Sequence, residues 1–202
     1  MKKVILSIAL GLIVLPSFSQ QIKTLFSNDD ARISIYGSYG GPLIQATQFN
    51  NDWGVLLGGK GGLIINRKFV VGGIGKGLAS DNNFLGNDLN GNTDVPLEIN
   101  YGAGGLFLEY IINIENPVHF SIPVNVMAGN VSVNKVNSGA EVESTRIFIL
   151  EPGVNVEFNV SETFIPAINI SYRQVFGDPL ENIRNQDVSG VNVGVVFKFG
   201  SF

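Results

Sequence analysis

Seven charged side chains stand inside apolar stretches of this chain of 202 residues, and they are its main candidates for chemistry. Glutamates and basic residues enclosed together could form buried ion pairs, or they could line a gated path for ions. A buried charge is costly unless it is paired, so we expect these side chains to share one enclosed polar face. They are Lys60, Lys76, Glu109, Glu151, Glu157, Arg173 and Lys198.

Two other segments resemble ligand sites in composition only. Asp, Asn and Gly crowd residues 81–94, and their oxygens could bind calcium, but the spacing and the closing Glu of an EF-hand are absent. These residue types are also ordinary turn formers. The glycine-rich run at 58–62 lacks the spacing and the Ser or Thr of a phosphate-binding loop. We therefore expect no metal site and no cofactor.

The charged residues must be positioned by β-strands, because apolar and polar residues alternate around them. We predict an all-β fold with eight strands, at 31–40, 53–66, 68–79, 97–112, 118–134, 146–160, 164–176 and 188–201. Short links fall at 66–67, 113–117 and 161–163, and longer polar links at 41–52, 80–96, 135–145 and 177–187. Short turns at one rim and long loops at the other predict an eight-stranded antiparallel up-and-down transmembrane β-barrel.

The strand at 146–160 shows the two faces of the sheet most clearly. Successive side chains of a strand point to opposite faces. Phe148, Leu150 and Val154 therefore share an apolar face, whereas Glu151 and Asn155 share a polar one. The strands at 118–134, 164–176 and 188–201 divide in the same way. In a membrane barrel the apolar face contacts lipid and the polar face lines the lumen.

The apolar residues of the segment 97–112 change from odd to even positions along its length. Leu97, Ile99 and Tyr101 are odd-numbered, whereas the apolar residues from Leu106 to Ile112 are mostly even-numbered. If both sets faced lipid, a β-bulge at 102–105 would have to reset the alternation, and the glycines there permit one. We therefore predict such a bulge. The aromatic belt at the long-loop rim would then contain Tyr39, Trp53, Tyr101, Phe148 and Tyr172.

The start and the charge of the chain suggest a compartment. Residues 1–19 have the basic start, apolar stretch and small-residue cleavage site of a secretory signal peptide, which leaves residues 20–202 as the barrel domain. The formal net charge is −4, and cysteine is absent. An acidic chain without a basic patch is not expected to bind nucleic acid. Outer-membrane lipids are the expected partners, with another outer-membrane protein as a further candidate.

Three stretches carry a resemblance to a known group of proteins. They are Tyr39-Gly40-Gly41-Pro42, the run from Gly58 to Asn66, and the run from Leu108 to Asn113. Together with the strand pattern, they resemble the small single-domain outer-membrane barrels of the OmpA/OmpX type, which are porin-like in architecture. The resemblance implies the outer membrane of a Gram-negative bacterium, with long loops extracellular and both termini periplasmic. It implies no reaction.

The register predicts one specific ion pair. If the link at 161–163 is centred on Glu162, Arg173 lies directly across from Glu151. The only histidine, His119, opens the strand at 118–134, beside the short-turn rim. A general base needs a partner within reach, and none is evident there, so a catalytic role is not expected.

Together these observations favour a non-enzymatic integral outer-membrane barrel with a structural or accessory role, either alone or as a subunit of a larger outer-membrane complex. Side chains can fill the lumen of an eight-stranded barrel, so we interpret the charged face as a network of ion pairs. A narrow porin-like channel is the main alternative. A lipid-modifying enzyme and a soluble ligand-binding barrel are further alternatives.

The two faces of the strand at 146–160 can be tested with charge. We expect Val154→Arg to lose about 2–4 kcal/mol of stability, because it places a charge toward lipid near the midplane. Asn155→Arg points into the polar lumen and should be better tolerated. The measurement is the fraction of heat-modifiable folded barrel, and equal losses in both variants would mean that the faces are assigned wrongly.

Overall fold

The computed structural model describes residues 34–50, 52–87 and 92–202. The predicted signal peptide lies outside the described residues. No helix within them is long and apolar enough to cross a membrane. The strands and the helix are β1 (Ile35–Phe49), β2 (Asp52–Ile65), β3 (Phe69–Leu78), β4 (Asn83–Gly86), β5 (Val95–Ile112), β6 (Val118–Lys135), β7 (Glu141–Phe158), β8 (Phe164–Gly177), α2 (Asn185–Val188) and β9 (Gly190–Ser201).

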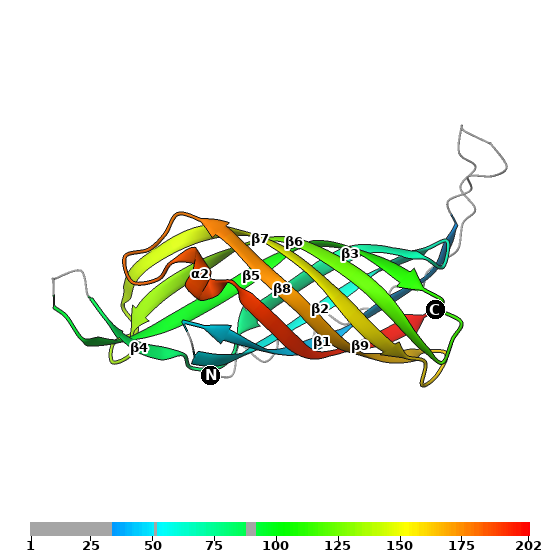
Figure 1. Cartoon of the computed structure of the whole chain (residues 1–202), viewed down its shortest axis with the longest axis horizontal. Coiled ribbons are helices and arrows are strands. Elements are labelled where there is room, and N and C mark those ends of the chain that lie inside the picture. Colours follow the sequence, from blue (N-terminus) through cyan, green and yellow to red (C-terminus); the bar gives the residue numbers. More distant parts are fainter. Residues whose placement is uncertain (1–33, 51, 88–91) are drawn as a thin grey trace, which may run out of the picture. The chain divides into compact units, whose positions relative to one another are not determined.

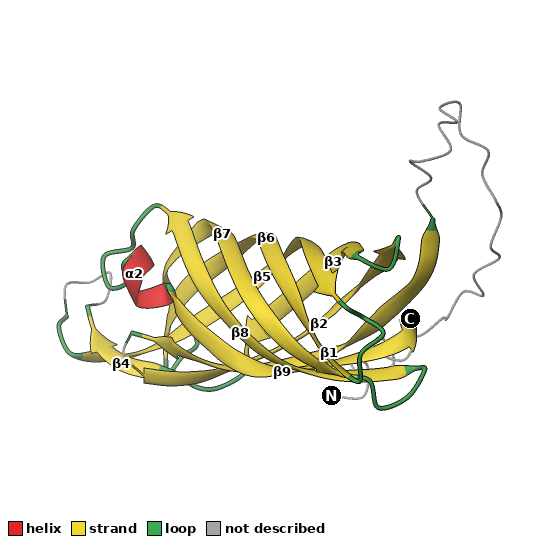
Figure 2. Ribbon diagram, turned by 45° about the vertical axis from the view of Figure 1, so that its right-hand side comes forward, coloured by secondary structure: helices red, strands yellow, loops and turns green. Residues whose placement is uncertain are grey.

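Eight strands close into an antiparallel barrel, as the sequence predicts (Figures 1 and 2). The order runs β3-β2-β1-β9-β8-β7-β6-β5, and pairing between β3 and β5 closes the ring. β4 is a short additional strand that pairs with the first residues of β5. Closure satisfies the backbone hydrogen bonds of every barrel strand without leaving an open edge.

The two ends of the barrel differ in their links. At one end, called the turn end here, short links at 66–68, 113–117 and 159–163 confirm the predicted turns. At the other, called the loop end, the predicted long link at 41–52 is wrong. β1 continues to Phe49, which pairs with Asp52, so only residues 50–51 connect β1 and β2. The polar residues of this segment misled the prediction because Gln45 and Thr47 face the lumen, where both are buried.

The other loop-end links contain more structure than the sequence suggested. β4 lies within the predicted loop at 80–96, and β7 begins at Glu141, within the predicted loop at 135–145. Between β8 and β9, α2 lies at the loop end of the barrel (Figure 1). Strand residues between the apolar belt and the loop end are polar and resemble loop residues in composition. The sequence pattern therefore predicts strands that are too short at this end.

The outward side chains form an apolar belt around the barrel. The predicted alternation in β2, β6, β7, β8 and β9 is confirmed, since the expected outward residues are exposed or half-buried and the inward residues are mostly buried. The most exposed large members of the belt include Trp53, Leu57, Leu63, Leu106, Leu108, Phe120, Val154, Ile170, Val191 and Phe199.

β5 does not change phase, so the predicted bulge is wrong. The strand pairs continuously with β6 from Leu97 to Ile112. Leu106 and Leu108 face outward, whereas Leu97, Ile99 and Tyr101 face inward and are at most 5% exposed. Two members of the predicted aromatic belt are therefore misplaced. Tyr101 lies inside the barrel, and Tyr39 lies inside toward the turn end, where it pairs with Gly62 and Gly200.

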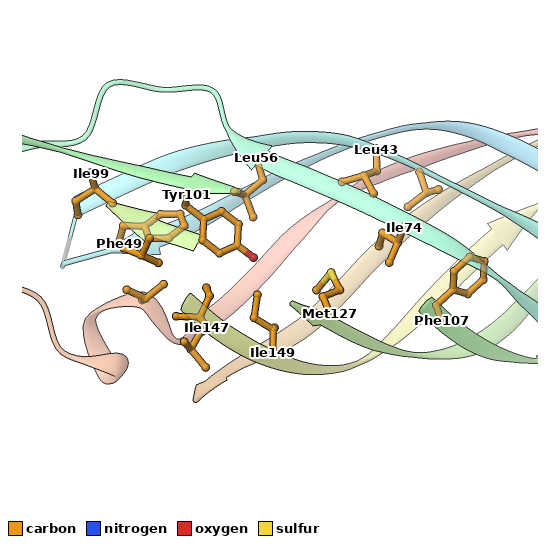
Figure 3. Packing of buried hydrophobic residues seen from close by; sticks show 14 of the residues in the cluster. Leu43, Phe49, Leu56, Ile74, Ile99, Tyr101, Phe107, Met127, Ile147 and Ile149 are labelled. Carbon is orange, nitrogen blue, oxygen red and sulfur yellow. The ribbon is translucent and has the colours of Figure 1, made fainter. Parts of the chain in front are cut away.

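The lumen is filled by side chains rather than open. Near the loop end, apolar residues form a layer that includes Phe49, Leu56, Ile99, Tyr101 and Ile147 (Figure 3). Ile183 and Val188, from the segment that carries α2, also belong to the buried apolar cluster. Toward the turn end, Ile64, Val70 and Ile111 are buried in the same cluster. The polar lumen residues lie between these apolar groups.

Inward-facing glycines allow neighbouring strands to approach closely. A Cβ added at Gly72 would lie 2.1 Å from the carbonyl oxygen of Gly61, closer than any tolerated contact. Gly73 points outward, next to Leu106, and its Cβ would meet only the carbonyl oxygen of Gly105 at 3.8 Å. The barrel therefore requires glycine at 72 but not at 73.

We predict that Gly72→Ala lowers the free energy of unfolding by about 1–3 kcal/mol, because the methyl group must push two backbones apart. Gly73→Ala is the matched control and should change it by no more than about 0.5 kcal/mol. Urea unfolding of the refolded barrel in detergent measures both. Similar values for the two variants would contradict the close approach of β2 and β3.

Candidate functional site

All seven predicted charged residues face the lumen, and each is at most 7% exposed. Strand alternation places them there from six different strands: β2, β3, β5, β7, β8 and β9. The structure divides them into two ion-pair clusters and one separate arginine. The first cluster lies nearest the turn end, and Arg173 lies nearest the loop end.

The first cluster joins Glu109 and Glu157 to two lysines. Lys60 Nζ donates to Glu109 Oε2 at 2.7 Å. Lys198 Nζ bridges the two acids, donating to Glu109 Oε1 and, at 2.6 Å, to Glu157 Oε1. The hydroxyl of Tyr39 also donates to Glu109 at 2.8 Å. Two carboxylates and two ammonium groups thus balance one another inside the barrel.

His119 has the acid partner that the sequence did not reveal. Its Nε2 lies 3.2 Å from Glu157 Oε2, and its Nδ1 lies 3.3 Å from the carbonyl oxygen of Asn116. Ser121 is close by, but its hydroxyl contacts Glu109 and Glu157 rather than the imidazole. A nucleophile must contact its base, so this arrangement is not a serine–histidine pair. It is part of the buried network.

The second cluster is built around Glu151. Lys76 Nζ donates to both of its carboxylate oxygens, at 2.8 and 2.6 Å. Ser171 donates to Oε1 at 3.0 Å. Lys76 also donates to Gln45, whose amide nitrogen donates to Asn169. Asn169 in turn donates to Asn155 of the first cluster, so hydrogen bonds connect the two clusters.

Arg173 is the separate residue, and its predicted ion pair with Glu151 is wrong. The predicted register is confirmed, because the neighbouring pairs Leu150–Gln174 and Gly153–Ser171 place the two residues opposite each other. The guanidinium, however, turns toward the loop end. Its Nε donates to the carbonyl oxygen of Val188 at 2.7 Å, and its terminal nitrogens contact Asn192 and the carbonyl oxygen of Gln48, both at 3.3 Å.

Aromatic rings account for the direction that Arg173 takes. Its guanidinium carbon lies 4.2 Å from the ring centre of Phe49 and 5.2 Å from that of Tyr101. A cation over an aromatic face is stabilised, more so when it is desolvated. Glu151 meanwhile binds Lys76, which reaches it from β3. No sequence pattern signals this choice, because strand register does not fix contacts across the lumen.

Several uncharged residues of the network were not predicted as site residues. Each shares the parity of a charged lumen residue on its own strand or, on β6, of His119, and this is the signal that identifies them: Ser121, Asn125, Asn155, Asn169, Ser171 and Asn192. Asn155 is fully buried and donates to both Glu109 and Ser121. The lumen therefore has no space for an arginine at position 155, so we expect Asn155→Arg to be poorly tolerated, contrary to the expectation from the sequence. Equal losses in Val154→Arg and Asn155→Arg would then not show that the faces are assigned wrongly.

The chemistry available to this network is ion pairing and hydrogen bonding. Each carboxylate is already bound to a lysine. Across residues 34–50, 52–87 and 92–202, no group of three or more His, Cys, Asp or Glu side chains could hold a metal ion. With Tyr39 and Gln45 from β1 and His119 and Ser121 from β6, the network links all eight strands of the barrel, so it acts on the stability of the whole ring.

Solved structures give this geometry a context. The N-terminal β-barrel domain of OprF from Pseudomonas aeruginosa matches 82% of this chain and 98% of that domain, with a TM-score of 0.53 and 11% identity. Neisserial surface protein A matches 85% of this chain and all of its own, with a TM-score of 0.52 and 12% identity. The chain has the fold of the small eight-stranded outer-membrane barrels. At 11% and 12% identity, the comparisons show a shared fold and nothing further. The chain matches no protein-family model and no curated protein.

We predict strong coupling between Lys76 and Glu151. Lys76→Met leaves the carboxylate of Glu151 buried without a cation, which typically costs about 3–5 kcal/mol, and Glu151→Gln should also destabilise by leaving the ammonium unpaired. The double variant should lose less free energy of unfolding than the two single variants lose together. A double-mutant cycle by urea unfolding measures this coupling.

Arg67→Met provides the surface control for this cycle. Arg67 and Glu115 form an ion pair of 3.3 Å at the turn end, with side chains 56% and 80% exposed. An exposed pair typically contributes about 0–1 kcal/mol, so this variant should be nearly neutral. Additive effects at Lys76 and Glu151 would contradict the buried pair.

Proposed function

We propose that this protein is a non-enzymatic integral barrel of a bacterial outer membrane with a structural or accessory role. The observation that carries this proposal is the combination of an apolar belt on the outer face and a filled lumen. Outward Val, Leu, Ile and Phe side chains on all eight strands match a lipid environment. A soluble ligand-binding barrel would place its apolar side chains inside and polar side chains outside.

The filled lumen argues against a steady channel. An ion crossing the barrel would have to displace the apolar layer that contains Phe49 and Ile99, and then break buried pairs such as Lys76–Glu151. The short acid–lysine contacts are those of a structural network rather than of a hydrated pore. The proposed role therefore depends on the outer surface and the loops, through membrane lipid or a neighbouring outer-membrane protein.

The network also supports a role without catalysis. His119, the residue best suited to acid–base chemistry, is 2% exposed, and its nearest acid already binds Lys198. A lipid-modifying enzyme needs a polar site that opens toward the lipid, whereas these groups are enclosed by the barrel wall. We propose that they serve stability.

This proposal can be tested in two media. After removal of residues 1–19, the refolded protein should partition into detergent, migrate as a heat-modifiable barrel and show no steady single-channel conductance in planar bilayers. Partition into buffer would contradict membrane insertion. Steady conductance would support the porin-like alternative instead.

The orientation can be tested with inserted epitopes. We propose that the loop end faces the cell exterior. An epitope inserted beside Gly139, an exposed residue of the link between β6 and β7, should stain on intact cells. An epitope at Glu162, in the link between β7 and β8 at the turn end, should stain only after permeabilisation. The reverse staining pattern would overturn the orientation.

A further inference from the structure

The segment between β8 and β9 closes the loop end of the barrel. We call residues 178–189 the lid. Its Ile183 and Val188 are at most 3% exposed and belong to the buried apolar cluster, and Leu180 packs against that cluster. Gly177 and Gly190 flank the lid at the ends of the two strands. Figure 1 shows α2, which lies within the lid, at the loop end.

Polar contacts hold the lid at three places, one of which is the side chain of Asn182, which exchanges two hydrogen bonds with the backbone of Asn87. On one side, both carboxylate oxygens of Glu143 on β7 accept backbone N–H groups of the lid, from Glu181 at 2.7 Å and from Asn182 at 3.0 Å. On the other side, the backbone N–H of Asn50 donates to the carbonyl oxygen of Asp187 at 2.8 Å. The contact of Arg173 with the carbonyl oxygen of Val188 is on this second side.

Arg173 differs from the other buried cations of the lumen. Lys60, Lys76 and Lys198 each lie within 2.7 Å of a carboxylate oxygen. Among the described residues, Arg173 contacts only neutral acceptors, two of which are backbone carbonyl oxygens. It is nevertheless fully buried. The lid therefore supplies part of the stabilisation that a carboxylate would otherwise give this charge.

A carboxylate is available to Arg173 in the opposite direction. Glu151 faces it across the β7–β8 pair, and directly opposed side chains have Cβ atoms about 4.5–5.5 Å apart. Glu151 Oε1 already accepts from Lys76, Asn125 and Ser171, whereas Oε2 accepts only from Lys76. Each carboxylate oxygen has two lone pairs, so Oε2 could take the guanidinium in addition to Lys76. A charged acceptor forms roughly twice as strong a hydrogen bond as a neutral one. The guanidinium thus has two competing positions.

We propose that Arg173 is the latch of a lid that can open. With the lid closed, the guanidinium binds the carbonyl oxygen of Val188. When the lid opens, the guanidinium turns to Glu151, and this ion pair offsets the contacts that the lid has lost. Opening about Gly177 and Gly190 withdraws Ile183 and Val188 from the apolar layer and admits water to Phe49 and Tyr101.

Hydrogen exchange of the lid amides tests the latch. In the full mature chain, refolded in detergent, Arg173→Lys should speed exchange of residues 178–189 by about tenfold or more, the effect of losing a hydrogen bond to a charged group. The double variant Lys76→Gln/Glu151→Gln removes the competing carboxylate together with the lysine that pairs with it, so that no unpaired charge is left behind. It should slow exchange of the lid, because the open state loses its ion pair. Glu143→Gln is the control, since it loosens the lid from the other side whatever Arg173 does.

The direction in which the double variant changes the exchange rate of the lid amides decides the proposal. A purely structural role for Arg173 predicts that Lys76→Gln/Glu151→Gln leaves lid exchange unchanged or faster, and either result overturns the latch. If that variant does not fold, a chain with residues 180–187 replaced by glycine and serine takes its place. Arg173→Lys and Glu151→Gln should be coupled about tenfold in the unfolding equilibrium of that chain, and more weakly coupled in the intact chain. Equal coupling in both chains also overturns the proposal.

Discussion

Eight strands enclose a lumen that side chains fill, so every inward charge must be stabilised by the groups that lie next to it inside the barrel. The rest of the structure depends on this constraint. Near the turn end, two lysines balance two glutamates: Lys60, Lys198, Glu109 and Glu157. Nearer the loop end, Lys76 balances Glu151. Because these partners come from different strands, each ion pair also ties the barrel wall together across its interior. A charge that finds no acid, such as Arg173, must be stabilised by carbonyl oxygens and aromatic rings.

The same narrowness limits the size of the inward residues. Where strands approach most closely, as at Gly72 beside Gly61, even a methyl group would collide with backbone. The outer face has no such limit, and it carries the large apolar side chains that suit lipid. The division between a crowded interior and a permissive exterior explains why neighbouring glycines of one strand are expected to respond differently to the same substitution.

The two ends of the barrel are closed in different ways. The turn end has short links and a small group of buried aliphatic side chains. The loop end is closed by an apolar layer to which the lid contributes Ile183 and Val188. Because the lid is held by polar contacts to Glu143 and Arg173, the proposed latch makes its position depend on the charge of Arg173 inside the barrel. This connects the ion-pair network to the loop-end surface, where contacts with partners are proposed.

The sequence by itself determined the barrel and its two faces, because the alternation of Val154 and Asn155 is a local property of an extended strand. It also determined which charges point inward, and that Arg173 faces Glu151, because register follows from a short turn. It could not determine the phase of β5 or the extent of β1, since inward apolar residues such as Ile99 and inward polar residues such as Gln45 both occur in a filled lumen. Only the tertiary structure decided that Lys76 rather than Arg173 binds Glu151. That choice depends on distances across the lumen between strands that are far apart in the sequence, and no local pattern records them.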